Sequence, residues 1–283
     1  MKQTISSKKA AGYFNVNEST IKRWADSGAL KCYRTEGGHR KFLLEDLKLY
    51  AKENNYVTSD FIFTGINGEY KNDVIGRNYK SLIKKLKRNI LSGDTEKTYG
   101  LLNTLYMNDF SLEEIFDYIV KETMIIIGKE WAEKTLNIEN EHIATNTLIA
   151  SLHQFERVIS KRQNLNKSAL CAGLENDYHE AGLLCVKITL EEEGWNVIYP
   201  GINLPFKSIS DLVTKSKTDL ICISSTYIKD QEDYIKKLND LKKICKKTGS
   251  VLIVGGENKL KSDISELTCK SITELKSIIK KFK

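Results

Sequence analysis

The chain has 283 residues, a formal net charge of +7 and only 2 prolines, and this length allows two or three domains with separate cores. No apolar run approaches the roughly 20 residues that a membrane-spanning helix needs, so we expect a cytoplasmic protein with no membrane partner. The six cysteines form no C-x-x-C pair and mostly lie in apolar runs, which is typical of reduced core residues rather than of a zinc site or a disulfide framework.

Residues 1–55 predict two short helices followed by a hairpin. A capping serine precedes small and apolar residues at helical spacing through Phe14, and a turn at 15–17 leads into a second helix over 19–27. Two short strands then meet at Gly37-Gly38, and another helix starts at Asp46. This order, with Arg-Thr-Glu-Gly-Gly-His-Arg over 34–40, resembles the winged helix-turn-helix DNA-binding domain of the MerR family.

The resemblance implies that the first domain binds double-stranded operator DNA. Residues 1–53 hold 11 basic and 6 acidic side chains, which suits a polyanion, although a solvated basic surface is the plain alternative. One such module makes few contacts, so we expect a homo-oligomer, either a dimer or a tetramer. Phosphate contacts are expected from Arg34, Thr35, His39, Arg40 and Lys41, and base contacts from Asn17, Ser19, Thr20, Lys22 and Arg23.

The middle of the chain predicts a linker and then a helical bundle. Residues 56–78 are weakly periodic and form the linker, with a short packed piece at 61–63. Residues 79–162 predict a four-helix bundle with short loops. Its helices are expected over 79–91, over 94–107, from a capping box at Ser111 and Glu114 to about Trp131, and over 139–159.

Residues 163–283 alternate short apolar runs with amphipathic segments. The alternation predicts a parallel, doubly wound α/β sheet of the flavodoxin-like (Rossmann-type) class. The expected strands are 169–174, 195–199, 220–224, 251–254 and 267–269, and the expected helices are 183–193, 207–215, 230–247 and 272–282. His179 falls on the loop after the first of these strands, at the end where such sheets bind ligands. A loop histidine without a partner is the plain alternative.

Three motifs follow three of these strands: Asp177-Tyr178-His179-Glu180-Ala181-Gly182, Ser224-Ser225-Thr226 and Gly255-Gly256. Their order and intervals resemble the corrinoid-binding domain of the methionine synthase and methylmalonyl-CoA mutase families. The resemblance implies that His179 is the lower axial ligand of cobalt. It further implies a tautomer-fixing partner in Asp177, space beside the nucleotide tail at Gly182, a benzimidazole contact at Ser224, and close backbone approach at Gly255 and Gly256. Thr226 replaces the usual leucine.

The bundle has a motif of its own, in which Trp131 precedes Glu141-His142 by a nine-residue interval. This motif resembles the light-sensing, MerR-type cobalamin repressors (the CarH and LitR group), whose bundle caps the upper face of the corrin. The resemblance implies that Trp131 stacks beside the upper axial group and that Glu141 and His142 hydrogen-bond an adenosyl group. Adenosylcobalamin is therefore the expected cofactor, with methylcobalamin as the other option. For Trp131 alone, a core aromatic is the plain alternative.

One position departs from that group. A histidine follows the tryptophan in its best-known photoreceptors, whereas this chain has Ala132, which cannot ligate a metal. Whether light sensing survives is left open, with water, His142 or His153 as replacement ligands. His153 lies about three turns beyond His142 and is expected to be a bundle or interface residue.

These features together predict a non-enzymatic transcriptional regulator, in the sense of a repressor, whose oligomeric state and DNA binding are set by adenosylcobalamin and its photolysis. Two other functions stay open. One is the corrinoid-carrying component of a methyltransferase or mutase. The other is a MerR-type regulator whose sensor domain responds without photochemistry or without cobalamin.

Overall fold

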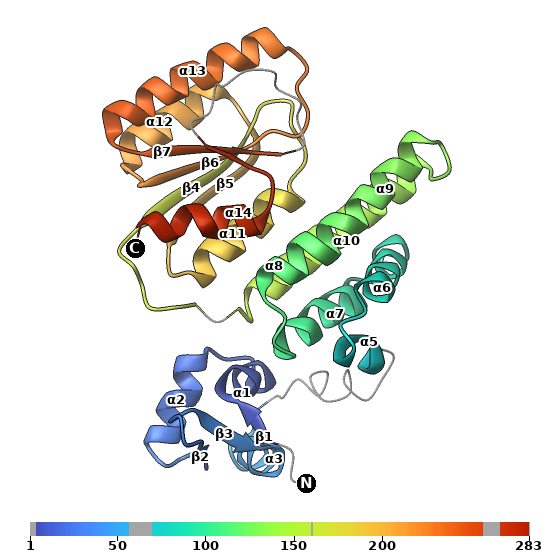
Figure 1. Ribbon diagram of the computed structural model, residues 1–283, viewed down its shortest axis with the longest axis vertical. Helices are drawn as coiled ribbons and strands as arrows, with labels where there is room; N and C mark the ends of the chain where they lie inside the picture. Colours follow the sequence, from blue (N-terminus) through green and yellow to red (C-terminus); the bar gives the residue numbers. More distant parts are fainter. Residues whose placement is uncertain (1–3, 57–69, 160, 257–266, 283) are drawn as a thin grey trace. The chain divides into compact units, whose positions relative to one another are not determined.

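The computed structural model describes residues 4–56, 70–159, 161–256 and 267–282 (Figure 1). The chain divides into two compact units, residues 1–160 and 161–283. The piece expected at 61–63 lies outside the described residues. Among the helices that are described, each is too short or too polar to cross a membrane.

The first unit begins with a small domain whose helices are held by a three-stranded antiparallel sheet of order β1-β3-β2. Strand β1 was not predicted, because three residues form a strand only once they have a partner, here through Ile5 beside Phe42. The Ser6 hydroxyl caps the first helix by accepting from the Lys9 amide at 3.3 Å, as predicted. The elements are β1 (Thr4–Ser6), α1 (Ser7–Phe14), α2 (Glu18–Asp26), β2 (Tyr33–Arg34), β3 (Arg40–Leu43) and α3 (Leu44–Glu53).

An aromatic cluster joins the three helices of this domain. The Trp24 ring lies 5.4 Å from Phe14 and 5.1 Å from Tyr50, measured between ring centroids, and Tyr56 packs against all three rings. Phe14 is buried and the other three rings lie at the edge of the core, where aromatic pairs still join the helices that carry them. The cluster therefore sets the angle at which α2 is presented.

The rest of the first unit is the predicted bundle, preceded by a short helix, α5. This helix corrects the linker prediction for 56–78, because Tyr70 and Val74 are buried there, and so short a helix leaves little periodicity in the sequence. The Ser111 hydroxyl and the Glu114 carboxylate cap each other's backbone amides, which confirms the capping box. The third helix contains a π-helical segment that the sequence did not predict, and this wider turn brings Phe116, Ile119 and Val120 into the core. The elements are α5 (Lys71–Ile75), α6 (Tyr79–Leu91), α7 (Thr95–Met107), α8 (Leu112–Ile115), η1 (Phe116–Lys121), α9 (Glu122–Ala132) and α10 (Ile138–Glu156).

The second unit is a five-stranded parallel sheet of order β5-β4-β6-β7-β8. Helices α11 and α14 cover one face, and α12 and α13 cover the other (Figure 1). This is the predicted doubly wound, flavodoxin-like arrangement. The elements are β4 (Ser168–Leu174), α11 (Ala181–Glu192), β5 (Asn196–Leu204), α12 (Phe206–Ser216), β6 (Leu220–Ser224), α13 (Gln231–Thr248), β7 (Val251–Gly255), β8 (Leu267–Cys269) and α14 (Ile272–Ile279) with a closing 3-10 turn (Lys280–Phe282).

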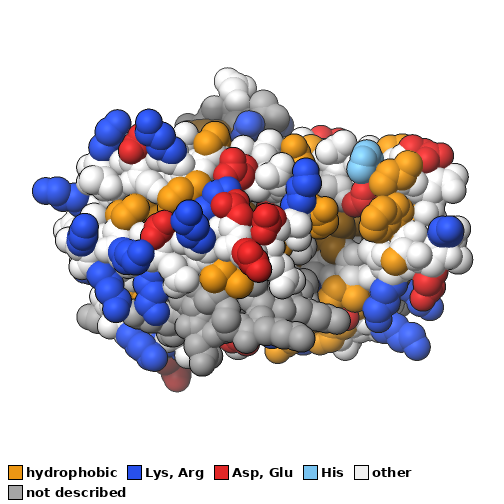
Figure 2. Space-filling view, turned by 90° about the horizontal axis from the view of Figure 1, so that it is seen from above, with side chains coloured by type: hydrophobic (Ala, Val, Ile, Leu, Met, Phe, Trp, Pro, Cys, Tyr) orange, Lys and Arg blue, Asp and Glu red, His pale blue; other side chains and the backbone are white. Residues whose placement is uncertain are grey.

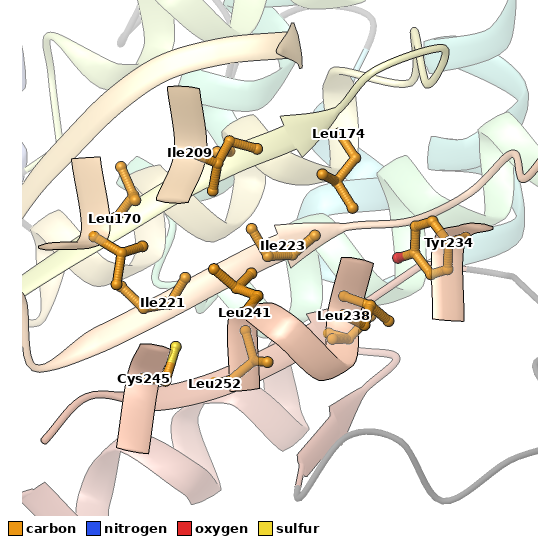
Figure 3. Packing of buried hydrophobic residues seen from close by; sticks show 13 residues of the cluster. Leu170, Leu174, Ile209, Ile221, Ile223, Tyr234, Leu238, Leu241, Cys245 and Leu252 are labelled. Carbon is orange, nitrogen blue, oxygen red and sulfur yellow. The ribbon is translucent and has the colours of Figure 1, made fainter. Parts of the chain in front are cut away.

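The main core of this unit lies between the sheet and α12 and α13. Figure 3 shows Ile221 and Ile223 of β6 facing Leu238 and Leu241 of α13, with Tyr234 at the end of the cluster. All of these side chains are buried, and full burial of an aliphatic side chain contributes about 1.5–3 kcal/mol. The packing holds the strands in register, so the loops at their carboxyl ends start from fixed positions.

Candidate cofactor-binding site

The order of the strands places a topological switch point between β4 and β6. From β4 the chain crosses to β5 on one side, whereas β6 lies on the other side of β4. The loops that follow β4 and β6 therefore leave in opposite directions, and open parallel sheets bind ligands at such a point. The loop after β4 carries His179, and the loop after β6 carries Thr226.

The Asp177 carboxylate joins these two loops. Its Oδ1 accepts from the His179 ring Nδ1 at 2.7 Å and from the His179 amide at 3.1 Å. Its Oδ2 accepts from the Thr226 amide at 2.6 Å. The predicted partnership of Asp177 with His179 is present, and the Thr226 main chain is a further partner that the sequence did not indicate.

The charge of Asp177 follows from these contacts. Burial acts to raise the pKa of the carboxyl, but hydrogen bonds from the His179 ring and from the Thr226 and His179 amides outweigh it, so the pKa of Asp177 is lowered. An ionised carboxylate can only accept, which makes Nδ1 the protonated ring nitrogen. The lone pair of the imidazole then resides on Nε2, on a side chain that is 58% exposed.

These residues fit a cobalt corrinoid. A neutral imidazole with its other nitrogen held by a carboxylate is the usual arrangement of a metal-ligating histidine. One histidine supplies one ligand, so it suits a metal that brings its remaining ligands with it. Space is also present beside it, because a Cβ added at Gly182 would meet no atom within 4 Å.

The serine and glycine motifs lie at the same edge of the sheet. Ser224 pairs with Gly173 on one side and Gly255 on the other, and its side chain is buried. The Ser225 amide donates to the Gly255 carbonyl at 2.8 Å. Ser224 and Gly255 are therefore brought beside the His179 loop, as the motif spacing predicts.

The glycines have a role within the protein itself. Gly256 has a φ of 119°, and a Cβ there would lie 2.1 Å from the Ser225 carbonyl oxygen. A Cβ at Gly255 would lie 3.0 Å from the Cys269 carbonyl oxygen. The close approach expected for a ligand is thus made by the main chain of β6 and β8, and these positions need glycine even before any cofactor binds.

Three side chains at this edge were missed by sequence reasoning. Tyr178 is 67% exposed and Tyr227 is 54% exposed, so two aromatic rings stand on the loops beside His179. Burial raises the pKa of Tyr234 to about 12. The two exposed tyrosines could have been noticed as neighbours of the motifs, whereas Tyr234 belongs to an ordinary apolar stripe on α13.

The predicted cap residues lie at one end of the bundle, where α9 ends and α10 begins. Trp131 is 49% exposed, so the core alternative for this side chain is wrong. Glu141 pairs with the His142 ring Nδ1 at 2.7 Å and accepts from the Thr145 hydroxyl at 2.8 Å. Ala132 is exposed next to Trp131, and the His153 side chain is exposed farther along α10.

The predicted DNA-contacting residues divide between α2 and the hairpin. On α2 and its cap, Asn17, Ser19, Lys22 and Arg23 are exposed, and Thr20 is half-buried. The hairpin forms as predicted, and Gly38 takes a φ of 77° at its tip. Thr35 accepts from the His39 amide at 3.2 Å within the turn. The set also includes His39, which is exposed, and Lys41, which is half-buried. Its last members are Arg34 and Arg40, and both contact Asp26.

Basic side chains are also found on the second unit, where they are mixed with acidic ones. Figure 2 shows lysines and arginines together with carboxylates over α13. There, Lys237 pairs with Asp233 and Glu175, and Lys243 pairs with Asp240. This face is a solvated mixture of both signs rather than a polyanion-binding surface.

Three family models match the chain. A B12 binding domain matches residues 167–259, a second B12 binding domain model matches residues 82–156, and a helix-turn-helix domain matches residues 4–55. These segments coincide with the second unit, the bundle and the small N-terminal domain. No curated protein matches the chain in sequence.

Solved structures share the fold at low identity. The Methanosarcina barkeri monomethylamine corrinoid protein aligns with a TM-score of 0.61 and 14% identity, over 72% of this chain and 99% of its own. A cobalamin-binding protein from Desulfitobacterium hafniense DCB-2 aligns with a TM-score of 0.37 and 16% identity over 75% and 96% of the two chains. The methanol:cobalamin methyltransferase complex MtaBC from Methanosarcina barkeri gives 0.32 and 16% over 70% and 84%.

The likeness to the monomethylamine corrinoid protein concerns the fold. It shows that a helical domain followed by a parallel α/β sheet is the architecture of a corrinoid protein. The His179 geometry and the two B12-domain matches then agree on the ligand. The chain carries a helix-turn-helix domain and two B12-binding domain regions, and its cofactor is a cobalamin.

Proposed function

We propose that the protein is a non-enzymatic, cytoplasmic transcriptional regulator, a repressor, whose binding to operator DNA is controlled by cobalamin. The observation that carries the proposal is the Asp177-held imidazole of His179 in a chain that also has a helix-turn-helix domain. Carrying a methyl group between proteins does not require a DNA-binding domain. The exposed residues of α2 and the hairpin support the same assignment.

The chain's own residues divide the work of holding the cofactor. His179 would present its ring Nε2 to the cobalt, while Asp177 holds the ring proton on Nδ1 and orients the ring. Ser224 and Gly182 would line the path of the nucleotide tail. On the bundle, exposed Trp131 would lie beside the upper group of the cofactor, and the Glu141–His142 pair would offer hydrogen bonds to an adenosyl moiety.

When bound, adenosylcobalamin supplies a cobalt–carbon bond that visible light can break. A ligand shifts an equilibrium only as far as its affinity differs between two states. Trp131 and Glu141 can respond to the presence of an upper group only if they contact it in one assembly state and not in the other. The proposed signal is therefore a change in oligomeric state that alters how many DNA-binding domains engage one operator.

The test uses full-length protein with adenosylcobalamin, kept dark or exposed to green light. We expect wild type to keep the red pigment through desalting, to bind an enriched duplex, and to change its gel-filtration volume after light. His179→Ala should lose the pigment and the response, whereas His153→Ala, which replaces an exposed histidine of the bundle, should keep the pigment. Unchanged pigment retention and DNA binding in His179→Ala would contradict the proposal. An unchanged elution volume after light would restrict it to chemical sensing of cobalamin.

The alternative is a corrinoid carrier in methyl transfer, which the fold shared with the monomethylamine corrinoid protein favours. It predicts a methylated cofactor that a partner methyltransferase demethylates, with no sequence-specific DNA binding. A methyl-transfer assay run beside selection of duplexes from a random pool separates the two functions.

A further inference from the structure

Asp26, the last residue of α2, contacts both arginines of the hairpin. Its Oδ1 accepts from Arg40 Nη2 at 2.5 Å and lies 3.5 Å from Arg34 Nη2. The arginines are 14 and 8 residues farther along the chain. One carboxylate oxygen therefore connects α2 to both strands of the hairpin.

The two arginines differ in exposure. The Arg40 side chain is 20% exposed, and its Nε is buried without a hydrogen-bond partner. The Arg34 side chain is 56% exposed. Arg40 is thus an internal anchor held by Asp26, whereas Arg34 keeps donors that are available to a ligand in solvent. The sequence-based expectation treated both alike as phosphate contacts.

Strand β3 of the hairpin is anchored by its pairing with β1 and by buried Phe42, whereas β2, which carries Arg34, has less to hold it. Strand β2 has only two residues, which pair with Lys41 and Arg40 of β3. A ladder this short is marginal by itself. Two charge-assisted contacts from one carboxylate add a geometric constraint that the ladder does not supply.

The sign of the charge makes this acid informative. A carboxylate beside a surface that meets phosphates weakens binding to any polyanion, because it repels the phosphates and partly neutralises two arginines. On charge alone, its removal would strengthen DNA binding. If Asp26 supports DNA recognition, it must therefore do so by an effect other than attraction of the phosphates.

We propose that Asp26 is a positioning residue for DNA recognition, which fixes Arg34 relative to α2 so that phosphate contacts and base contacts are made in one register. The inference rests on the proposed DNA-binding function. With the constraint, the hairpin holds α2 over a chosen set of base pairs. Without it, the hairpin still attracts phosphates, but its contacts no longer fix which base pairs α2 meets.

The experiment uses the full chain with its cofactor and two duplexes. One is enriched from a random pool by the wild type, and the other is a scrambled duplex of the same composition. Asp26→Asn is compared with Glu53→Gln, which removes the same charge from the same domain but from an exposed carboxylate at the end of α3. Asp26→Glu restores the charge, and circular dichroism checks that each variant is folded.

We expect Asp26→Asn to lower the preference for the enriched duplex over the scrambled one by about tenfold, the size of a mismatched base pair. Hydroxyl-radical footprints should lose protection at the flanks of the site while general binding persists. Glu53→Gln should strengthen binding to both duplexes alike and leave the preference within about twofold. Asp26→Glu should recover part of the preference.

Two results would overturn the inference in distinguishable ways. If Asp26→Asn strengthens binding to both duplexes as Glu53→Gln does, with an unchanged footprint, Asp26 is only a repulsive charge and this inference fails alone. If the wild type enriches no duplex from the pool, the proposed DNA-binding function fails, and the inference fails with it.

Discussion

At the scale of single residues, the Asp177 carboxylate uses one oxygen on His179 and the other on the Thr226 amide. The first contact sets which imidazole nitrogen carries the proton, and the second ties that imidazole to the loop after β6. A histidine on an exposed loop would otherwise lose rotamer freedom each time it bound a metal. Asp177 pre-orients His179, so less of the binding free energy is spent on ordering it.

Replacing Asp177 by asparagine tests this role. The amide has one accepting oxygen, so it cannot serve both His179 and Thr226, and we expect the affinity for cobalamin to fall about 10–100-fold. The measurement is a spectroscopic titration of the full chain. Asp240→Asn, which removes a carboxylate on α13 whose side chain is 42% exposed, is the control and should leave the affinity unchanged. An affinity for Asp177→Asn within twofold of wild type would show that His179 needs no partner.

A pair of glycine substitutions separates a ligand role from a folding role. Gly256→Ala places a Cβ 2.1 Å from the Ser225 carbonyl oxygen at a positive φ, so we expect the free energy of unfolding to fall by roughly 2–3 kcal/mol. Gly182→Ala lies in open space on α11 and should not destabilise the cofactor-free protein. It should weaken cobalamin binding, as measured by equilibrium dialysis. Unchanged binding would show that the nucleotide tail does not pass Gly182.

At the scale of elements, the opposite edge of the same sheet is held by Asp219, just before β6. Its carboxylate accepts from the Ser168 amide and from Lys167 Nζ, each at 2.9 Å. Burial acts to raise the pKa of Asp219, but the Ser168 amide and Lys167 outweigh it and lower that pKa. The contacts join the start of β4 to the start of β6, which keeps their carboxyl ends level at the cofactor site.

The pH dependence of Asp219 follows from the direction of its shift. A carboxyl whose pKa is lowered by folding stabilises the protein above its ordinary pKa, and this contribution is lost as the pH falls through the lowered value. We expect Asp219→Asn to lower the free energy of unfolding by about 1 kcal/mol at pH 7, with the difference shrinking below about pH 4. Urea unfolding at several pH values measures it, with exposed Asp211→Asn as the control. A difference that stays constant down to pH 3 would contradict the assignment.

At the scale of the whole molecule, the segment that follows the bundle belongs to the cobalamin-binding unit. Arg162 pairs with the buried Glu193 carboxylate at 2.7 Å, and its amide donates to the Glu192 carbonyl at 2.9 Å. The Leu165 amide donates to the Gly194 carbonyl at 3.0 Å. The first residues of the second unit are thus fastened to the end of α11.

Two fragments test the independence of this unit. We expect residues 161–283 to fold and to bind cobalamin through His179, as seen by the absorbance retained after dialysis. Residues 167–283 lack the Arg162 contact, so Glu193 loses a partner and the fragment should unfold at a lower temperature, a loss of about 1–3 kcal/mol. Equal melting temperatures of the two fragments would show that the segment contributes nothing. Absence of binding in both would place essential cofactor contacts in the first unit.

Periodicity and local motifs in the sequence alone determined the order of the elements other than β1, α5 and the π-helical segment, as well as the parallel α/β class, the capping box at Ser111 and the place of His179 after a strand. The resemblance to the corrinoid-binding domain implied its partner Asp177. These features depend on residues a few positions apart, where backbone propensity and hydrogen-bonding reach decide the outcome. The Asp177–His179 pair is such a short-range contact.

Tertiary structure decided the contacts between distant residues. Three of these contacts are the Thr226 amide with Asp177, the Ser225 carbonyl with Gly256, and the two arginines with Asp26. Each joins segments whose approach depends on how whole elements pack. The exposure of Trp131, which separated a cap residue from a core residue, likewise depends on its neighbours in space. No spacing in the sequence encodes these distances, because packing sets them only after the elements have formed.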